Sequence, residues 1–111
     1  MVAIHNNAPA LTLRAGTDAI AHLREYGLRA GDVDIVPGAA GGPKALGING
    51  LEQAVFGDFL PRAPRRRTLI GASIGSWRFA AIAMGQDPAK GLARLAELYT
   101  CQRFPKGITS R

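Results

Sequence analysis

Two glycine clusters constrain the fold of this chain most, because each interrupts an apolar run and opens a helical pattern. The first cluster occupies residues 37–44, directly after the segment 33–36, Val-Asp-Ile-Val. The second occupies residues 71–75, after the apolar run 68–70. Glycine permits tight turns and close approach of backbone segments. The clusters therefore predict two strand-to-helix turns, and chemistry is most naturally sought there.

Strands and helices are expected to alternate along the chain. The predicted helices cover 18–26, 46–60, 76–84 and 88–102, and the predicted strands cover 11–14, 33–36 and 68–70. Thr17 and Asp87 are expected N-caps, and Gly27 is the expected end of the first helix. This order indicates an α/β fold with a parallel sheet covered by helices on both faces. Since two or three strands make a thin sheet, we expect residues 1–111 to form one end of a larger domain.

Composition favours a folded, soluble chain. Hydrophobic residues make up 47% of the 111 residues and charged residues 20%, and the net charge is +6. Part of this excess lies in the basic run 62–67, which we interpret as a solvated loop; it has no interleaved aromatic residues for stacking on bases. Cys101 is the single cysteine, and residues 1–5 do not resemble the start of a signal peptide. We therefore expect a cytoplasmic protein with no nucleic-acid partner.

The second cluster matches the nucleophile elbow pattern G-x-S-x-G, in which Gly71 and Gly75 flank Ser73. A serine in such a turn is strained and pushed out at the carboxyl edge of the sheet. The following helix then directs free N–H groups and its positive end toward the oxygen that becomes negative. Ser73 is accordingly the predicted nucleophile. The alternative is a glycine turn in which Ser73 only caps the helix.

The first cluster is placed to supply oxyanion donors. It lacks the Walker A spacing and the dinucleotide-binding spacing, so a phosphate-binding loop of either type is not predicted. Acyl transfer through a tetrahedral intermediate needs several N–H groups aimed at one oxygen. Pro43 has no N–H. The candidate donors are the backbone N–H groups of Gly41, Gly42, Lys44 and Ile74; a plain strand-to-helix turn is the alternative.

The two clusters together, about thirty residues apart, resemble the patatin-like phospholipases, and the wider strings 37–47 and 71–78 resemble a bacterial subgroup of that family. Ala40 and Ala45 stand where the family usually has glycine. The resemblance implies a serine–aspartate dyad that hydrolyses acyl esters of lipids, with Ser73 as nucleophile and Gly41, Gly42 and Lys44 in the oxyanion loop. It implies a lipid or acyl ester substrate, transient contact with a membrane surface, and no cofactor.

The sequence contains no convincing base for Ser73. The family's aspartate belongs to an Asp-Gly pair, which this sequence lacks, and Asp87 is interpreted as a helix cap. His5 and His22 both precede Ser73, whereas an α/β-hydrolase histidine follows the nucleophile. No spacing indicates a metal site. We expect a fragment that lacks the catalytic aspartate and is inactive alone; the alternatives are part of a general α/β-hydrolase esterase and a non-catalytic basic binding module.

Overall fold

Parallel pairing of two short strands organises the fold. In the computed structural model, which describes residues 10–107, β1 (Ile35–Gly38) lies beside β2 (Thr68–Gly71). The register sets Gly38 opposite Gly71. Since the strands are parallel and end together, both glycine clusters begin at the same edge of the sheet. The chain thus has a mixed α/β fold, as the sequence predicted. The β1 strand begins two residues later than expected, and β2 begins at Thr68 as expected and ends one residue later.

The segment between the strands is helical from Gly42 to Arg62, but irregular. It runs through η2 (Gly42–Ile48, 3-10), α2 (Asn49–Ala54), η3 (Val55–Phe59, π) and η4 (Leu60–Arg62, 3-10). The prediction of one regular helix over 46–60 is wrong in this respect. Glycine in a helix interior weakens the α conformation, and this segment contains several glycines. The helical segment also begins earlier than expected, because Pro43 sits in the first turn, where proline is favoured.

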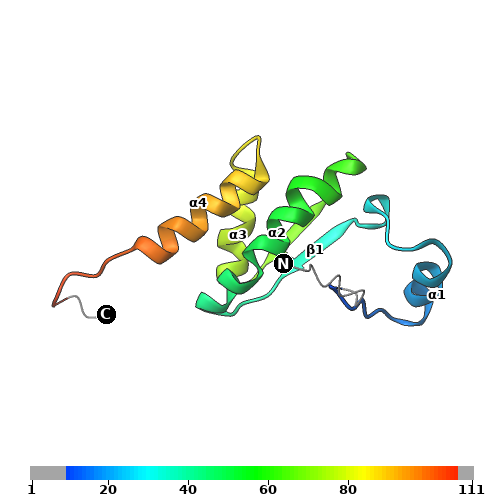
Figure 1. Cartoon of the computed structure of the whole chain (residues 1–111), viewed down its shortest axis with the longest axis horizontal. Helices are drawn as coiled ribbons and strands as arrows, with labels where there is room; N and C mark the ends of the chain where they lie inside the picture. Colours follow the sequence, from blue (N-terminus) through cyan, green and yellow to red (C-terminus); the bar gives the residue numbers. More distant parts are fainter. Residues whose placement is uncertain (1–9, 108–111) are drawn as a thin grey trace, which may run out of the picture.

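Two further helices follow β2. They are α3 (Ile74–Ala83), which packs on both strands, and α4 (Pro88–Cys101), which packs on α2 and α3; Figure 1 shows the three helices. The α4 helix begins as predicted: the Asp87 carboxylate accepts a hydrogen bond from the Lys90 N–H at 3.2 Å. The Asp87 interpretation as an N-cap is therefore confirmed.

The hydrophobic core lies on one face of the sheet. Buried side chains from η3, η4, α3 and α4 form it, and Val36 and Leu69 pack against them from the strands. Alternate strand residues point to opposite faces. Ile35 and Ile70 accordingly face away and are each 58% exposed. Within residues 10–107, helices cover one face of the sheet only, so the expected cover on both faces is not found there.

The first part of the described chain contains α1 (Thr17–Tyr26) and η1 (Ala30–Asp32). The predicted helix is confirmed, and its end at Gly27 has the expected positive φ of 72°. Thr17 is not its cap: Gly16 holds that position, and no side chain caps the helix. The predicted strand 11–14 is wrong, because those residues pair with no strand and Leu11 and Leu13 are exposed. His5 and the predicted absence of a signal peptide concern residues 1–5, outside the described residues.

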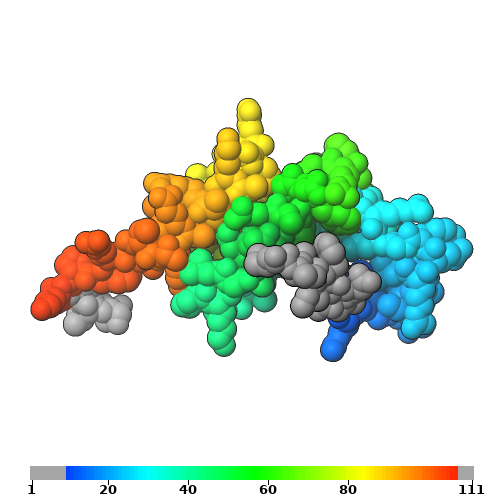
Figure 2. All heavy atoms as spheres, in the orientation of Figure 1, coloured from blue at the N-terminus to red at the C-terminus, as the bar shows by residue number. Residues whose placement is uncertain are grey.

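The described chain is elongated. Figure 2 shows the α1 region at one end and the segment after α4 at the other. The radius of gyration is 17.3 Å, against about 13 Å for a compact domain of this length. No helix between residues 10 and 107 combines the length and the apolar character needed to cross a membrane.

Candidate active site

Ser73 has an unusual backbone conformation at the turn between β2 and α3. Its φ is 53° and its ψ is −120°, and it is the only non-glycine residue with a positive φ in the described chain. Such a conformation costs about 1–3 kcal/mol and persists only where the surroundings enforce it. Although Ser73 occupies the N-cap position of α3, its side chain makes no cap hydrogen bond. The side-chain cap that the alternative interpretation assumes is therefore not formed.

Both glycines of the elbow are required by packing. A Cβ atom built on Gly71 would lie 2.4 Å from the backbone nitrogen of Ser76, and one built on Gly75 would lie 2.3 Å from the carbonyl oxygen of Gly38. The hydroxyl of Ser76 donates a hydrogen bond to the Gly71 carbonyl at 2.7 Å, which closes the turn. The absent side chains thus let α3 cross directly over the ends of both strands.

The start of α3 leaves one N–H group free beside Ser73. The Gly75 N–H donates to the Ala72 carbonyl and the Ser76 N–H donates to the Ser73 carbonyl, each at 2.9 Å. The Ile74 N–H has no acceptor among residues 10–107. A helix start is also the positive end of the helix dipole. The turn therefore offers the Ile74 N–H as a donor to an anion at Ser73. This is the role that the sequence suggested for Ile74.

In the glycine loop of the first cluster, Gly42 differs from Gly41 and Lys44, which are joined by a hydrogen bond. Gly42 begins η2 with a φ of 53°, and a Cβ built on it would meet no atom within 4 Å. The Lys44 N–H donates to the Gly41 carbonyl at 3.2 Å. This bond engages the Lys44 N–H, contrary to its expected role as an oxyanion donor. Gly42 remains the loop residue with an open approach.

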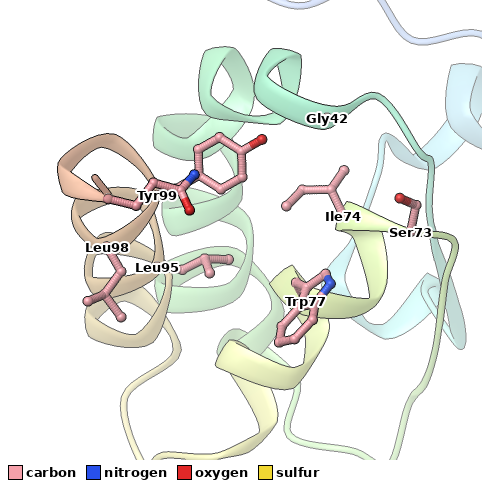
Figure 3. A pocket seen from close by; sticks show the side chains of 8 residues that line it. Gly42, Ser73, Ile74, Trp77, Leu95, Leu98 and Tyr99 are labelled. Carbon is pink, nitrogen blue, oxygen red and sulfur yellow. The ribbon is translucent and has the colours of Figure 1, made fainter. Parts of the chain in front are cut away.

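One cavity brings three of the predicted residues together. Its volume is about 400 Å³, and Gly42, Ser73 and Ile74 all line it. Figure 3 shows Trp77 of α3 and Leu95, Leu98 and Tyr99 of α4 around the same space. Gly41 and Lys44 do not line this cavity; they border a different hollow of about 460 Å³. The structure therefore assembles Gly42, Ser73 and Ile74 and separates the other two.

No base for Ser73 stands in this cavity. Within the part of the chain that the structure describes, its lining includes no carboxylate and no imidazole. His22 instead contacts the Asp32 carboxylate at 3.2 Å. The Arg29 N–H donates to Asp32 and lowers the pKa of that carboxyl group. Residues 10–107 also contain no group of three His, Cys, Asp or Glu side chains that could hold a metal ion.

Most arginines of the basic run 62–67 are engaged within the chain. Arg67 donates to the backbone carbonyls of Val33, Ala30 and Ala63 at 2.8–2.9 Å. Arg65 pairs with Asp34, and Arg62 pairs with Asp58. The contacts of Arg67 with Val33 and Ala30, and of Arg65 with Asp34, fasten the loop to the segment before β1. They leave less positive charge for an external partner than the sequence alone suggested.

Sequence reasoning missed a buried ion pair beside the site. Arg78 of α3 and Glu52 of α2 are 6% and 8% exposed, and the Arg78 Nε donates to the Glu52 Oε1 at 2.8 Å. Both charges lie inside segments that otherwise follow an apolar helical pattern. A charged residue on the buried face of a helix was the available signal, since such residues are almost never fully buried unless paired.

Sequence reasoning named no residue of α4 among the candidate site residues. Leu92 is buried, but Leu98 is 53% exposed and lines the Ser73 cavity with Leu95 and Tyr99. The spacing of these residues predicts that they share one face of the helix. It does not indicate that the C-terminal part of this face lines a cavity.

No family model, no curated protein and no solved structure matches this chain.

Proposed function

We propose that this protein is a serine acyl hydrolase of the patatin-like type, acting on lipid esters, with Ser73 as its nucleophile. One observation carries the proposal. Ser73 is held in a strained backbone conformation, its hydroxyl makes no hydrogen bond to the start of α3, and it lies beside a cavity that Gly42 and Ile74 also line. Strain of this kind is typical of functional sites, and the strand–serine–helix context is that of a nucleophile elbow.

The proposed reaction has two steps. The Ser73 Oγ attacks the carbonyl carbon of the ester and loses its proton to a base. The carbonyl oxygen becomes an oxyanion and accepts hydrogen bonds from the N–H groups of Ile74 and Gly42, which line the same cavity. The C–O bond to the alcohol then breaks, and the alcohol leaves with the proton. Water releases the acyl group from Ser73 in a second attack of the same kind.

The base is proposed to be an aspartate, as the family resemblance implies. The cavity lining among residues 10–107 contains no such group, and a serine without a base is a weak nucleophile. The reaction therefore requires an aspartate brought to Ser73 from outside this lining. For this reason, activity is best measured on the full-length protein, that is, the product of the complete gene.

The walls of the cavity support an acyl substrate. Trp77, Leu95 and Leu98 line both the Ser73 cavity and a second hollow of about 680 Å³, which continues along α3 and α4 to Met84. An acyl chain attached at Ser73 would lie along this apolar path. Trp77 is 68% exposed and Met84 is 86% exposed, which supports transient contact with a membrane surface as part of the proposal.

A fluorophosphonate probe tests the nucleophile, because it reacts covalently with an activated serine. We expect mass spectrometry of the labelled full-length protein to locate the probe on Ser73. Ser73→Ala should abolish labelling. Ser76→Ala is the matched control, since this second serine of the turn donates to the Gly71 carbonyl; it should still be labelled. Labelling that persists in Ser73→Ala would remove the proposed nucleophile.

Ester chain length separates the lipid hydrolase from a general esterase. We expect kcat/KM to rise from short to long p-nitrophenyl esters, and Trp77→Ala to reduce this rise by removing a wall of the apolar path. A preference for acetate esters, unchanged in Trp77→Ala, would support a general esterase instead.

A further inference from the structure

The buried Arg78–Glu52 pair lies between the two glycine clusters. We propose that Arg78, held by Glu52, is a positioning residue that fixes the glycine loop relative to Ser73. The inference rests on the proposed function, because it assigns the pair to the same site. Arg78 does not line the Ser73 cavity itself, so it acts through the loop and not on the substrate.

Arg78 reaches the loop directly. Besides its 2.8 Å bond to Glu52, its Nη1 donates to the carbonyl oxygen of Ala39 at 3.3 Å. Ala39 follows the last residue of β1 and precedes the segment that turns at Gly42. The adjacent Gly38 carbonyl already accepts a hydrogen bond from the Ala72 N–H at 2.9 Å. Arg78 therefore extends the contact between the elbow and β1 one residue into the loop.

Glu52 connects the segment after the glycine loop to Arg78. It belongs to α2, which continues directly from η2, and η2 begins at Gly42. The loop is thus bound through Ala39 before the turn and through the η2–α2 segment after it. Both attachments meet at the one guanidinium group on α3, the helix that starts at the elbow. The position of Gly42 relative to Ser73 then depends on this ion pair.

The energetics of the pair favour a role in orientation. The second carboxylate oxygen of Glu52, Oε2, is buried with no hydrogen-bond partner in the described chain. A buried ion pair with incomplete hydrogen bonding gives little net stability, and apolar residues of similar volume often replace such a pair without loss. Arginine suits the task better than lysine, because its rigid planar group holds the Nε and Nη1 donors at fixed, separate positions, whereas all the donors of lysine lie on one nitrogen at the end of a flexible chain.

The decisive variant replaces the pair by apolar residues of similar size. Arg78→Met with Glu52→Leu in the full-length protein should leave the melting temperature unchanged or raised. It should lower kcat for ester hydrolysis about 100-fold, the order expected when a catalytic group is misplaced by about 1 Å, while KM stays nearly constant. Hydrogen exchange of the amides of residues 40–42, 44 and 45 should become faster. Arg62→Ala with Asp58→Ala, which removes an exposed pair, should change none of these quantities.

The outcomes separate the inference from the proposed function. If the unmodified protein has no Ser73-dependent activity, the proposed function fails, and hydrogen exchange still decides whether the pair orders the loop. If the apolar double variant keeps both its kcat and its exchange rates, the inference is overturned. If that variant does not fold, Arg78→Lys decides, because it keeps the charge but has no second nitrogen to reach the Ala39 carbonyl in the geometry of Arg78. A lower kcat at constant KM supports the inference, and an unchanged kcat overturns it.

Discussion

The backbone of Gly75 rests directly on the carbonyl oxygen of Gly38, so that a Cβ on Gly75 would stand 2.3 Å from that oxygen. Gly38 ends β1 and Gly75 lies in the first turn of α3. The contact therefore joins the start of the glycine loop to the elbow, and it leaves no room for any side chain.

Gly75→Ala should push α3 away from the end of β1. We expect a loss of about 1–3 kcal/mol in the free energy of unfolding, the range for overpacking, because the atom in the way is backbone. Chemical denaturation measures the change. Gly50→Ala is the control: it lies in α2 with no atom within 4 Å of its added Cβ, so stability should rise by about 0.5–1 kcal/mol. Equal effects at both positions would contradict the close contact.

Ser73→Gly and Ser73→Ala should differ in stability although both lack the hydroxyl. Alanine keeps a Cβ at a φ of 53°, whereas glycine adopts positive φ readily. Glycine releases the backbone strain at this position, but it also loses more backbone entropy on folding. We expect the first effect to be the larger, so that Ser73→Gly is more stable than Ser73→Ala by about 1 kcal/mol. Thermal melting of the two variants checks this. An alanine variant as stable as the glycine variant would argue against strain at this position.

Gly42→Val should reduce activity far more than stability. The added side chain meets open space but imposes the cost of a positive φ, about 1–2 kcal/mol. Valine keeps the backbone N–H, but its side chain would enter the cavity that Gly42 lines and keep the oxyanion away from that donor. If the Gly42 N–H holds the oxyanion, kcat should therefore fall roughly 100- to 1000-fold, the loss expected when an oxyanion donor is removed. Gly42→Asn separates the two effects, because asparagine tolerates positive φ; it should retain more stability than the valine variant. Unchanged kcat in Gly42→Val would remove the loop from the mechanism.

Lys44→Ala should be milder than Gly42→Val. The substitution keeps the backbone N–H that donates to Gly41 and removes only an exposed ammonium group. If that group steers an anionic head group toward the site, the loss in kcat/KM should shrink as salt is raised, since salt screens exposed charges. Kinetics on an anionic and a neutral ester at low and high salt measure this. A loss as large as that of Gly42→Val would mean that Lys44 has a role in the loop beyond steering.

Leu92→Ala should destabilise the protein strongly. Leu92 is fully buried where α4 joins the core, and truncation of such a side chain costs about 2–5 kcal/mol. Leu98→Ala, on the same helix but 53% exposed, should cost much less. Denaturant midpoints of the two variants provide the comparison, and similar losses would show that α4 does not pack as described.

The elements with a strong local signal could be predicted from the sequence. The Asp87-Pro88 start of α4 and the Gly27 end of α1 depend on capping and on positive φ, which neighbouring residues decide. The segment 11–14 has apolar residues suited to a strand, but a strand needs a partner, and pairing is a tertiary property. The predicted strand there was wrong for that reason.

The sequence by itself determined the turn at Ser73, because small residues at fixed spacing after an apolar run permit few other geometries. The parallel pairing of β1 with β2 is a tertiary contact, which the order of strands and helices only favoured. Only the tertiary structure decided which donors meet. The sequence placed Gly41, Gly42 and Lys44 in one loop, but the loop folds so that Gly42 alone of the three lines the Ser73 cavity. Packing likewise brought Arg78 and Glu52 together across 26 residues, since contacts between distant segments follow from how helices dock and not from local pattern.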